Sequence, residues 1–211
     1  MNRPPFDLFR LFLSLFQDLQ PVSRSQYLPG AVLLVGYPML SVLLGTGNEG
    51  QAFVTAFMAA LSLRIAIGFD GVVRQMLRRY SATMTVPLAV VVATSPLLVM
   101  PLVDDPLSCQ RVQSLFFLLI AAVFLVDVLK GQVATAASFW PDAAMRPHLA
   151  RLTRVMVVYN LGFLLLNETL IQVVHASHWL LFWAVLPVVG QAVLQALVVT
   201  VINLEDDGQT V

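Results

Sequence analysis

Seven polar side chains lie inside long segments of this chain in which most side chains are apolar. They comprise one guanidinium, two carboxylates and four amides, namely Arg64, Asp127, Asn160, Asn167, Glu168, Gln191 and Gln195. If these segments cross a membrane, each ionisable side chain near the centre of one costs about 2.5–3.5 kcal/mol on insertion. We therefore expect each of the seven to have a partner or a function.

Arg64 and Asp127 fall at similar depths in the second and fourth apolar segments. A buried ion pair between them would tie the two segments together, and removing one member would cost about 3–5 kcal/mol. Each residue also has a local alternative. The Arg64 side chain is long enough to reach the cytoplasmic headgroups, and Asp127 can pair with Lys130 within its own helix.

The four amides divide between the fifth and sixth segments. Asn160 and Asn167 are seven residues apart and share a helix face, and Gln191 and Gln195 are one turn apart on theirs. Hydrogen bonds between amides on neighbouring membrane helices stabilise their packing by about 0.6 kcal/mol each. Packing of the fifth segment against the sixth is the first interpretation of these amides.

Glu168 has no evident cationic partner in the sequence. The alternative to a packing role is a polar site near the midplane, where Glu168 would bind a proton or a cation beside Asn167 and Gln191. Burial would raise the pKa of such a carboxyl. The sequence leaves packing and transport both open.

Metal, haem and nucleophilic chemistry find little support in the residue types. The one cysteine, Cys109, cannot form an internal disulfide or a multi-cysteine metal site. His148 is predicted on one side of the membrane and His175 and His178 on the other, so they form no ligand set. No glycine-rich phosphate loop is present. We expect neither an enzyme nor a bound cofactor or metal, and the zero net charge suggests no nucleic-acid partner.

The segments that must position these residues are long and apolar. Apolar residues make up 58% of the 211-residue chain and charged ones 11%, more apolar side chain than a soluble domain of this size can bury. Six segments are long enough to cross about 30 Å of hydrocarbon. The sequence predicts an all-α polytopic membrane protein with spans at approximately 28–46, 51–70, 84–103, 113–130, 155–174 and 179–203.

Basic residues indicate the orientation of these spans. Ten of the twelve lie before the first span, between the second and third, or between the fourth and fifth, and one lies in an opposite loop, at Arg111. Positive residues remain in the cytoplasm, so both termini are predicted there. The bias of eleven arginines to one lysine suggests a GC-rich genome, hence a bacterial inner membrane.

The chain ends and the loops complete the predicted layout. Residues 1–25 are expected to form an amphipathic interfacial helix that rests on the cytoplasmic leaflet or docks on protein. Residues 26–204 are expected to form the transmembrane domain, and 205–211 a short acidic cytoplasmic tail. Cys109 is predicted in an outer loop. Trp140 is predicted in the inner interfacial belt, and Trp179 and Trp183 in the outer one.

Short loops and apolar outer faces favour a non-catalytic function. The sequence predicts a subunit or assembly factor of a membrane complex, in contact with the lipid bilayer and with other membrane proteins through its apolar helix faces. A small transporter or channel built around Glu168 is the alternative, and a lipid-modifying enzyme is a weaker one.

Overall fold

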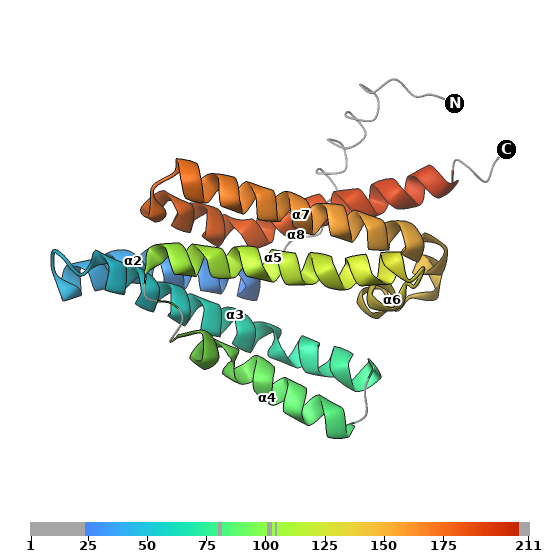
Figure 1. The fold of residues 1–211 in the computed structure, drawn as a ribbon, viewed down its shortest axis with the longest axis horizontal. Helices are drawn as coiled ribbons and strands as arrows, with labels where there is room; N and C mark the ends of the chain where they lie inside the picture. The colour runs from blue at the N-terminus through green and yellow to red at the C-terminus, as the bar shows by residue number, and fades with distance from the viewer. Residues whose placement is uncertain (1–23, 80–81, 101–102, 104, 207–211) are drawn as a thin grey trace. The chain divides into compact units, whose positions relative to one another are not determined.

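Helices account for the secondary structure of the described part of this chain (Figure 1). The computed structural model describes residues 24–79, 82–100, 103 and 105–206. Within these residues every regular element is an α-helix or a short 3-10 helix, which confirms the all-α prediction there. The bounds are η1 Arg24–Tyr27, α2 Leu28–Leu44, α3 Glu49–Arg79, α4 Ala82–Val99, α5 Pro106–Leu129, α6 Ala134–Phe139, η3 Ala143–His148, α7 Leu149–Val173 and α8 Ala176–Asp206.

Five segments of the described residues are long and apolar enough to cross a membrane. They are Ser25–Leu44, Glu49–Gly71, Pro106–Leu129, Ala143–Val173 and Ala176–Asn203. Lipid hydrocarbon offers no hydrogen-bond partners for the backbone. A helix pairs its backbone groups internally, so such segments are stable in lipid as helices. The third predicted span corresponds to α4, whose apolar stretch is the shorter Thr85–Pro96. The count of six spans therefore stays a prediction.

Both ends of the predicted layout lie largely outside the described residues. Residues 1–23 of the predicted interfacial helix are not among them, and neither are residues 207–211 of the acidic tail. The described part of that tail, Glu205 and Asp206, continues helix α8. The predicted interfacial helix and the orientation of the termini stay predictions.

Helix α5 begins earlier than predicted, at Pro106 rather than near residue 113. The Oδ1 atom of Asp105 accepts a hydrogen bond from the Ser108 backbone N–H at 2.6 Å, as the side chain of an N-cap does, and proline suits the first helical position. Hydrogen bonds from Ser108 and the charge of Arg111 hold the pKa of Asp105 below its usual value. The N-cap therefore determines where α5 starts, one to two turns before the start that hydropathy predicts.

Two compact units divide the described residues. In the described part of the chain, unit 2 comprises residues 24–116 and 165–187, and unit 1 comprises residues 117–164 and 188–206. Helices α5, α7 and α8 each contribute residues to both units.

Each unit has its own apolar core. In unit 2, helix α3 packs against α2 and α4, and the fully buried side chains include Leu33, Phe53, Phe57, Trp179 and Trp183. In unit 1, the smaller core consists of Phe124, Ala136, Leu149 and Met156.

Candidate functional site: a buried polar network

Polar side chains from four helices meet inside the apolar core of unit 2. We call them the polar network. Its side chains are those of Arg64 on α3, Gln113 and Ser114 on α5, Asn167 and Glu168 on α7, and Trp179 and Trp183 on α8, and Gln110 on α5 takes part through its backbone carbonyl. Gln110, Gln113, Ser114, Asn167 and both tryptophans are buried.

Asn167 is the centre of the network and has no exposed surface. Its Nδ2 donates to the Gln110 backbone carbonyl at 3.1 Å and to the Ser114 hydroxyl at 2.8 Å. Its Oδ1 accepts from the Trp179 indole Nε1 at 2.8 Å. An indole N–H can only donate, so this contact fixes which amide atom faces α8. One side chain on α7 thereby joins α5 to α8.

The Ser114 hydroxyl continues the network to Glu168. It accepts from Asn167 and donates to the Glu168 Oε1. A hydroxyl has one donor and two acceptor positions, so a single serine can serve both neighbours. Glu168 is partly buried and its carboxylate receives this bond from α5. The residue predicted to lack a cation therefore has a hydroxyl partner.

Trp183 makes a second set of polar contacts, through three different parts of the residue. Its indole Nε1 donates to the Gln113 Oε1 at 3.0 Å. The Arg64 guanidinium carbon lies 3.6 Å from the centroid of its ring, which is a cation–π contact. The Arg64 Nη2 also donates to the Trp183 backbone carbonyl, at 3.5 Å. Arg64 thus joins α3 to α8 without a carboxylate.

Proline explains why the Trp183 carbonyl is open to Arg64. In a regular helix this carbonyl would accept from the backbone N–H of residue 187, four positions later. Residue 187 is Pro187, which has no N–H, inside α8. In a membrane helix, a carbonyl freed by proline needs another donor, and a neighbouring helix can supply it. Arg64 supplies it here.

We expect the substitutions Arg64→Met and Pro187→Ala to be coupled. Arg64→Met alone removes the donor to the Trp183 carbonyl. With Pro187→Ala also present, position 187 regains an N–H that can bond the same carbonyl, so Arg64→Met should cost about 1 kcal/mol less there. Unfolding in mixed detergent micelles measures all four members of the cycle. Pro38→Ala is the matched control, a proline inside α2 that should show no coupling, and additive effects of Arg64→Met and Pro187→Ala would contradict the assignment.

Aromatic rings surround the tryptophans of the network. Phe57 lies 6.0 Å from Trp179 and 5.5 Å from Trp183 between ring centroids, and Phe53 lies 6.2 Å from Trp179. These contacts exclude water from the indole N–H groups. A hydrogen bond is stronger in such low-dielectric surroundings, and an unpaired donor there is more costly.

The predicted pairing of Arg64 with Asp127 is replaced by other contacts in the structure. The Arg64 side chain donates to the Trp183 carbonyl and lies over the Trp183 ring. The buried Asp127 Oδ2 accepts from the Thr135 backbone N–H at 2.6 Å, near the start of α6. Asp127 therefore stabilises the turn that follows α5 rather than a bridge to Arg64.

The predicted hydrogen bonds between amides of α7 and α8 are also replaced by other contacts. Asn167 does contact α8, but through Trp179 rather than through a glutamine. The Asn160 Nδ2 donates within its own helix, to the Met156 carbonyl at 2.7 Å. Gln191 and Gln195 are half-buried in unit 1. In that unit a hydroxyl links the two helices, because Tyr159 donates to the Gly190 carbonyl at 2.9 Å.

Two placements predicted from the sequence are wrong. Trp179 and Trp183 have no exposed surface, so they belong to the core of unit 2 and not to an interfacial belt. Cys109 is buried in the first turn of α5 rather than placed in a loop, because that helix starts at Pro106. Hydropathy cannot separate an apolar ring facing lipid from one packed in protein.

Three members of the network were missed from the sequence: Gln110, Gln113 and Ser114. The signal was present, since positions 110, 113 and 114 are spaced three and four apart and share one face of α5. The spans had been chosen by hydropathy, which left the first of these positions outside the helix. A search for polar stripes across the predicted helix ends would have found them.

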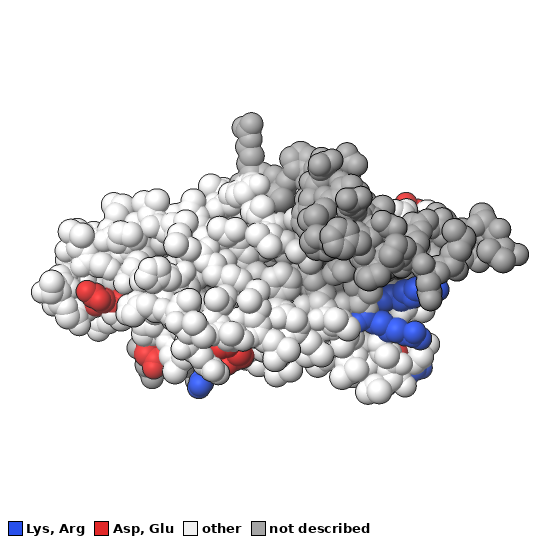
Figure 2. All heavy atoms as spheres, turned by 90° about the horizontal axis from the view of Figure 1, so that it is seen from above, with Lys and Arg blue, Asp and Glu red and all other residues white. Residues whose placement is uncertain are grey.

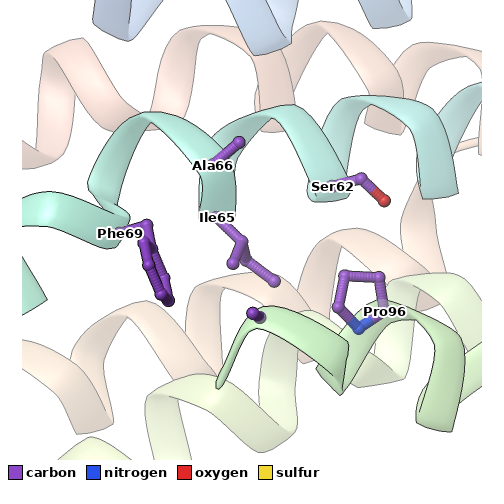
Figure 3. A pocket seen from close by; sticks show the side chains of 6 residues that line it. Ser62, Ile65, Ala66, Phe69 and Pro96 are labelled. Atoms are coloured by element: carbon purple, nitrogen blue, oxygen red, sulfur yellow. The ribbon is translucent and has the colours of Figure 1, made fainter. Parts of the chain in front are cut away.

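An apolar pocket between α3 and α4 also belongs to unit 2 (Figure 3). Its volume is about 360 Å³, and its lining is Ser62, Ile65, Ala66, Phe69, Ala93 and Pro96. The Ser62 hydroxyl donates to the Met58 carbonyl of its own helix at 2.8 Å. The described lining of the pocket therefore contains no acid or base, and its serine hydroxyl is already bonded.

Metal-ligating side chains do not gather in the part of the chain that the structure describes. No group of three His, Cys, Asp or Glu residues there is placed to hold a metal ion. No family model, curated protein or solved structure matches the chain. The polar network and the exposed helix faces are therefore the features of the molecule that bear on its function.

Proposed function

We propose that the protein is a non-catalytic subunit or assembly factor of a membrane complex, located in a bacterial inner membrane. The observation that carries this proposal is that the polar network is closed. Each of its polar side chains that could have served a substrate is bonded to another helix of unit 2. Among the described residues, no buried side-chain nitrogen or oxygen lacks a hydrogen-bond partner. Such a network stabilises helix packing.

The helix faces that point outward support the same function. Large apolar side chains are exposed along α2, at Val35, Met39, Val42 and Leu43, and along α5, at Leu115, Leu118, Leu119 and Val123. Uncharged side chains form most of the described surface in Figure 2. Lipid or the apolar helices of partner proteins would cover such faces. Arginine in alternate loops supports a cytoplasmic position for both termini.

Transport is the second candidate, and one observation favours it. Glu168 is only partly buried, and among the described residues its carboxylate is bonded by the hydroxyl of Ser114 rather than by a cation. A carboxylate so placed can exchange a proton or cation more readily than one held in an ion pair. Asn167, predicted beside Glu168 in this site, lies in the same unit, whereas Gln191 belongs to unit 1.

Purification in mild detergent followed by mass spectrometry distinguishes the two functions. The proposal predicts companion membrane proteins in stoichiometric amounts, which Glu168→Gln should leave in place. Transport predicts the chain alone or with copies of itself, and ion flux into reconstituted liposomes that Glu168→Gln abolishes. Recovery without companions, together with Glu168-dependent flux, would overturn the proposed function in favour of transport.

A further inference from the structure

Exposed basic side chains gather in unit 1, where α5 ends and α7 begins. Lys130 follows the last residue of α5, Arg146 lies in η3, and Arg151 and Arg154 lie in the first two turns of α7. All four are exposed. We call them the basic surface. Figure 2 shows blue side chains close together at the right of the view, the side on which Figure 1 draws α6.

The segment between these two helices is held in place by its own contacts. Asp127 accepts from the Thr135 N–H, and Ala136 packs with Phe124, Leu149 and Met156 in the core of unit 1. Gly131 has a φ of +63°, the left-handed conformation that ends many helices. The segment between α5 and α7 therefore packs against both helices, and its backbone holds the basic side chains in defined positions.

Acidic side chains in this segment are already engaged by the backbone. Asp142 is exposed, and its Oδ1 accepts from the Ala144 N–H at 3.1 Å. Asp127 is buried and bonds Thr135. Among the described residues, no salt bridge involves Lys130, Arg146 or Arg154, whereas Arg151 has an interaction of its own within the protein. The surface therefore carries an excess of positive charge.

Aromatic side chains lie beside the basic surface, at the end of an apolar helix. Phe139 is 53% exposed, and Trp140 is half-buried beside it, with their ring centroids 6.2 Å apart. Aromatic rings next to basic residues, at the end of an apolar span, are typical of the membrane–water interface. The span Pro106–Leu129 ends one residue before Lys130.

We propose that the basic surface is a binding site for anionic phospholipid headgroups. The phosphate and the net negative charge of such a lipid complement Lys130, Arg146 and Arg154, while Phe139 and Trp140 contact its glycerol and upper acyl region. An attraction of about 1 kcal/mol for each basic residue near an anionic membrane surface corresponds to about a fivefold change in affinity. This inference is independent of whether the protein assembles with companions or transports an ion.

The test compares lipids that differ only in charge. The full chain, stripped of lipid in a neutral detergent, is titrated with phosphatidylglycerol or with phosphatidylcholine of the same acyl chains, and bound lipid is counted by native mass spectrometry. We expect preferential retention of phosphatidylglycerol, which weakens as the ionic strength is raised. Equal retention of the two lipids would overturn the proposal. It is also the result expected if the surface binds an acidic protein segment instead of a lipid.

Charge-removing variants locate the site. The triple change Lys130→Gln, Arg146→Gln and Arg154→Gln should lower phosphatidylglycerol affinity by about 100-fold. Arg146→Gln alone should lower it about fivefold, and the matched control Arg111→Gln, an exposed arginine in unit 2, should leave it unchanged. Arg151 is left intact because it has an interaction within the protein. Undiminished phosphatidylglycerol preference in the triple variant, with helical content retained, would place the lipid elsewhere and overturn the assignment.

Discussion

Replacing Asn167 by leucine should lower the free energy of unfolding by about 2 kcal/mol. The amide makes three hydrogen bonds to two other helices, and each such bond between membrane helices is worth about 0.6 kcal/mol and at most about 1.7. The substitution also leaves the Trp179 indole N–H without an acceptor, in a place with no exposed surface. Denaturation in mixed detergent micelles, followed by tryptophan fluorescence, measures the change.

Asn160 supplies the matched control, because it is also a buried asparagine of α7. Its amide donates to the Met156 carbonyl of the same helix, so Asn160→Leu should cost well under 1 kcal/mol. Trp179→Phe should be non-additive with Asn167→Leu, because the two changes remove the same hydrogen bond. Equal costs for the two asparagine variants would show that Asn167 does not hold the helices together.

Hydropathy predicted which segments are helical but not what their polar residues contact. An apolar run long enough to span a membrane is visible in one dimension, because a helix satisfies its backbone within the run. The partner of Asn167 depends on how α5, α7 and α8 are rotated about their axes. That rotation is set by packing of side chains such as Phe57 against Trp179, which no single segment encodes.

Charge was a poor guide to the contacts of Arg64. A carboxylate is the predicted partner, because opposite charge is the usual partner of a buried guanidinium. The structure instead provides the face of Trp183 and the carbonyl that Pro187 leaves without its usual donor. That carbonyl could have been found from the sequence by counting four residues back from the proline. The choice of Arg64 as its donor required the packing of α3 against α8.

Close backbone approach was also invisible in the sequence, and Gly30 shows why. A Cβ atom at Gly30 would lie 2.8 Å from the Ala184 carbonyl oxygen and 3.0 Å from the Ala184 Cα. Small residues let membrane helices approach this closely. In the sequence, however, Gly30 resembles Gly36 in the same helix, whose Cβ would find its nearest neighbour, the Ala56 Cβ, at 4.0 Å. The spacing of α2 from α8 distinguishes them.

Gly30→Ala should therefore destabilise the protein, by about 1–3 kcal/mol or more. The atoms in the way belong to the backbone of α8, which cannot rotate aside as a side chain can, so α2 must shift and lose contacts in the core of unit 2. Gly36→Ala is the control, and it should be neutral or raise stability by up to about 1 kcal/mol, because alanine favours a helix over glycine. Measuring the unfolding free energy of both variants in mixed micelles tests whether Gly30→Ala lowers stability while Gly36→Ala leaves it unchanged or raises it. Equal stability of the two variants would mean that α2 and α8 do not approach each other at Gly30.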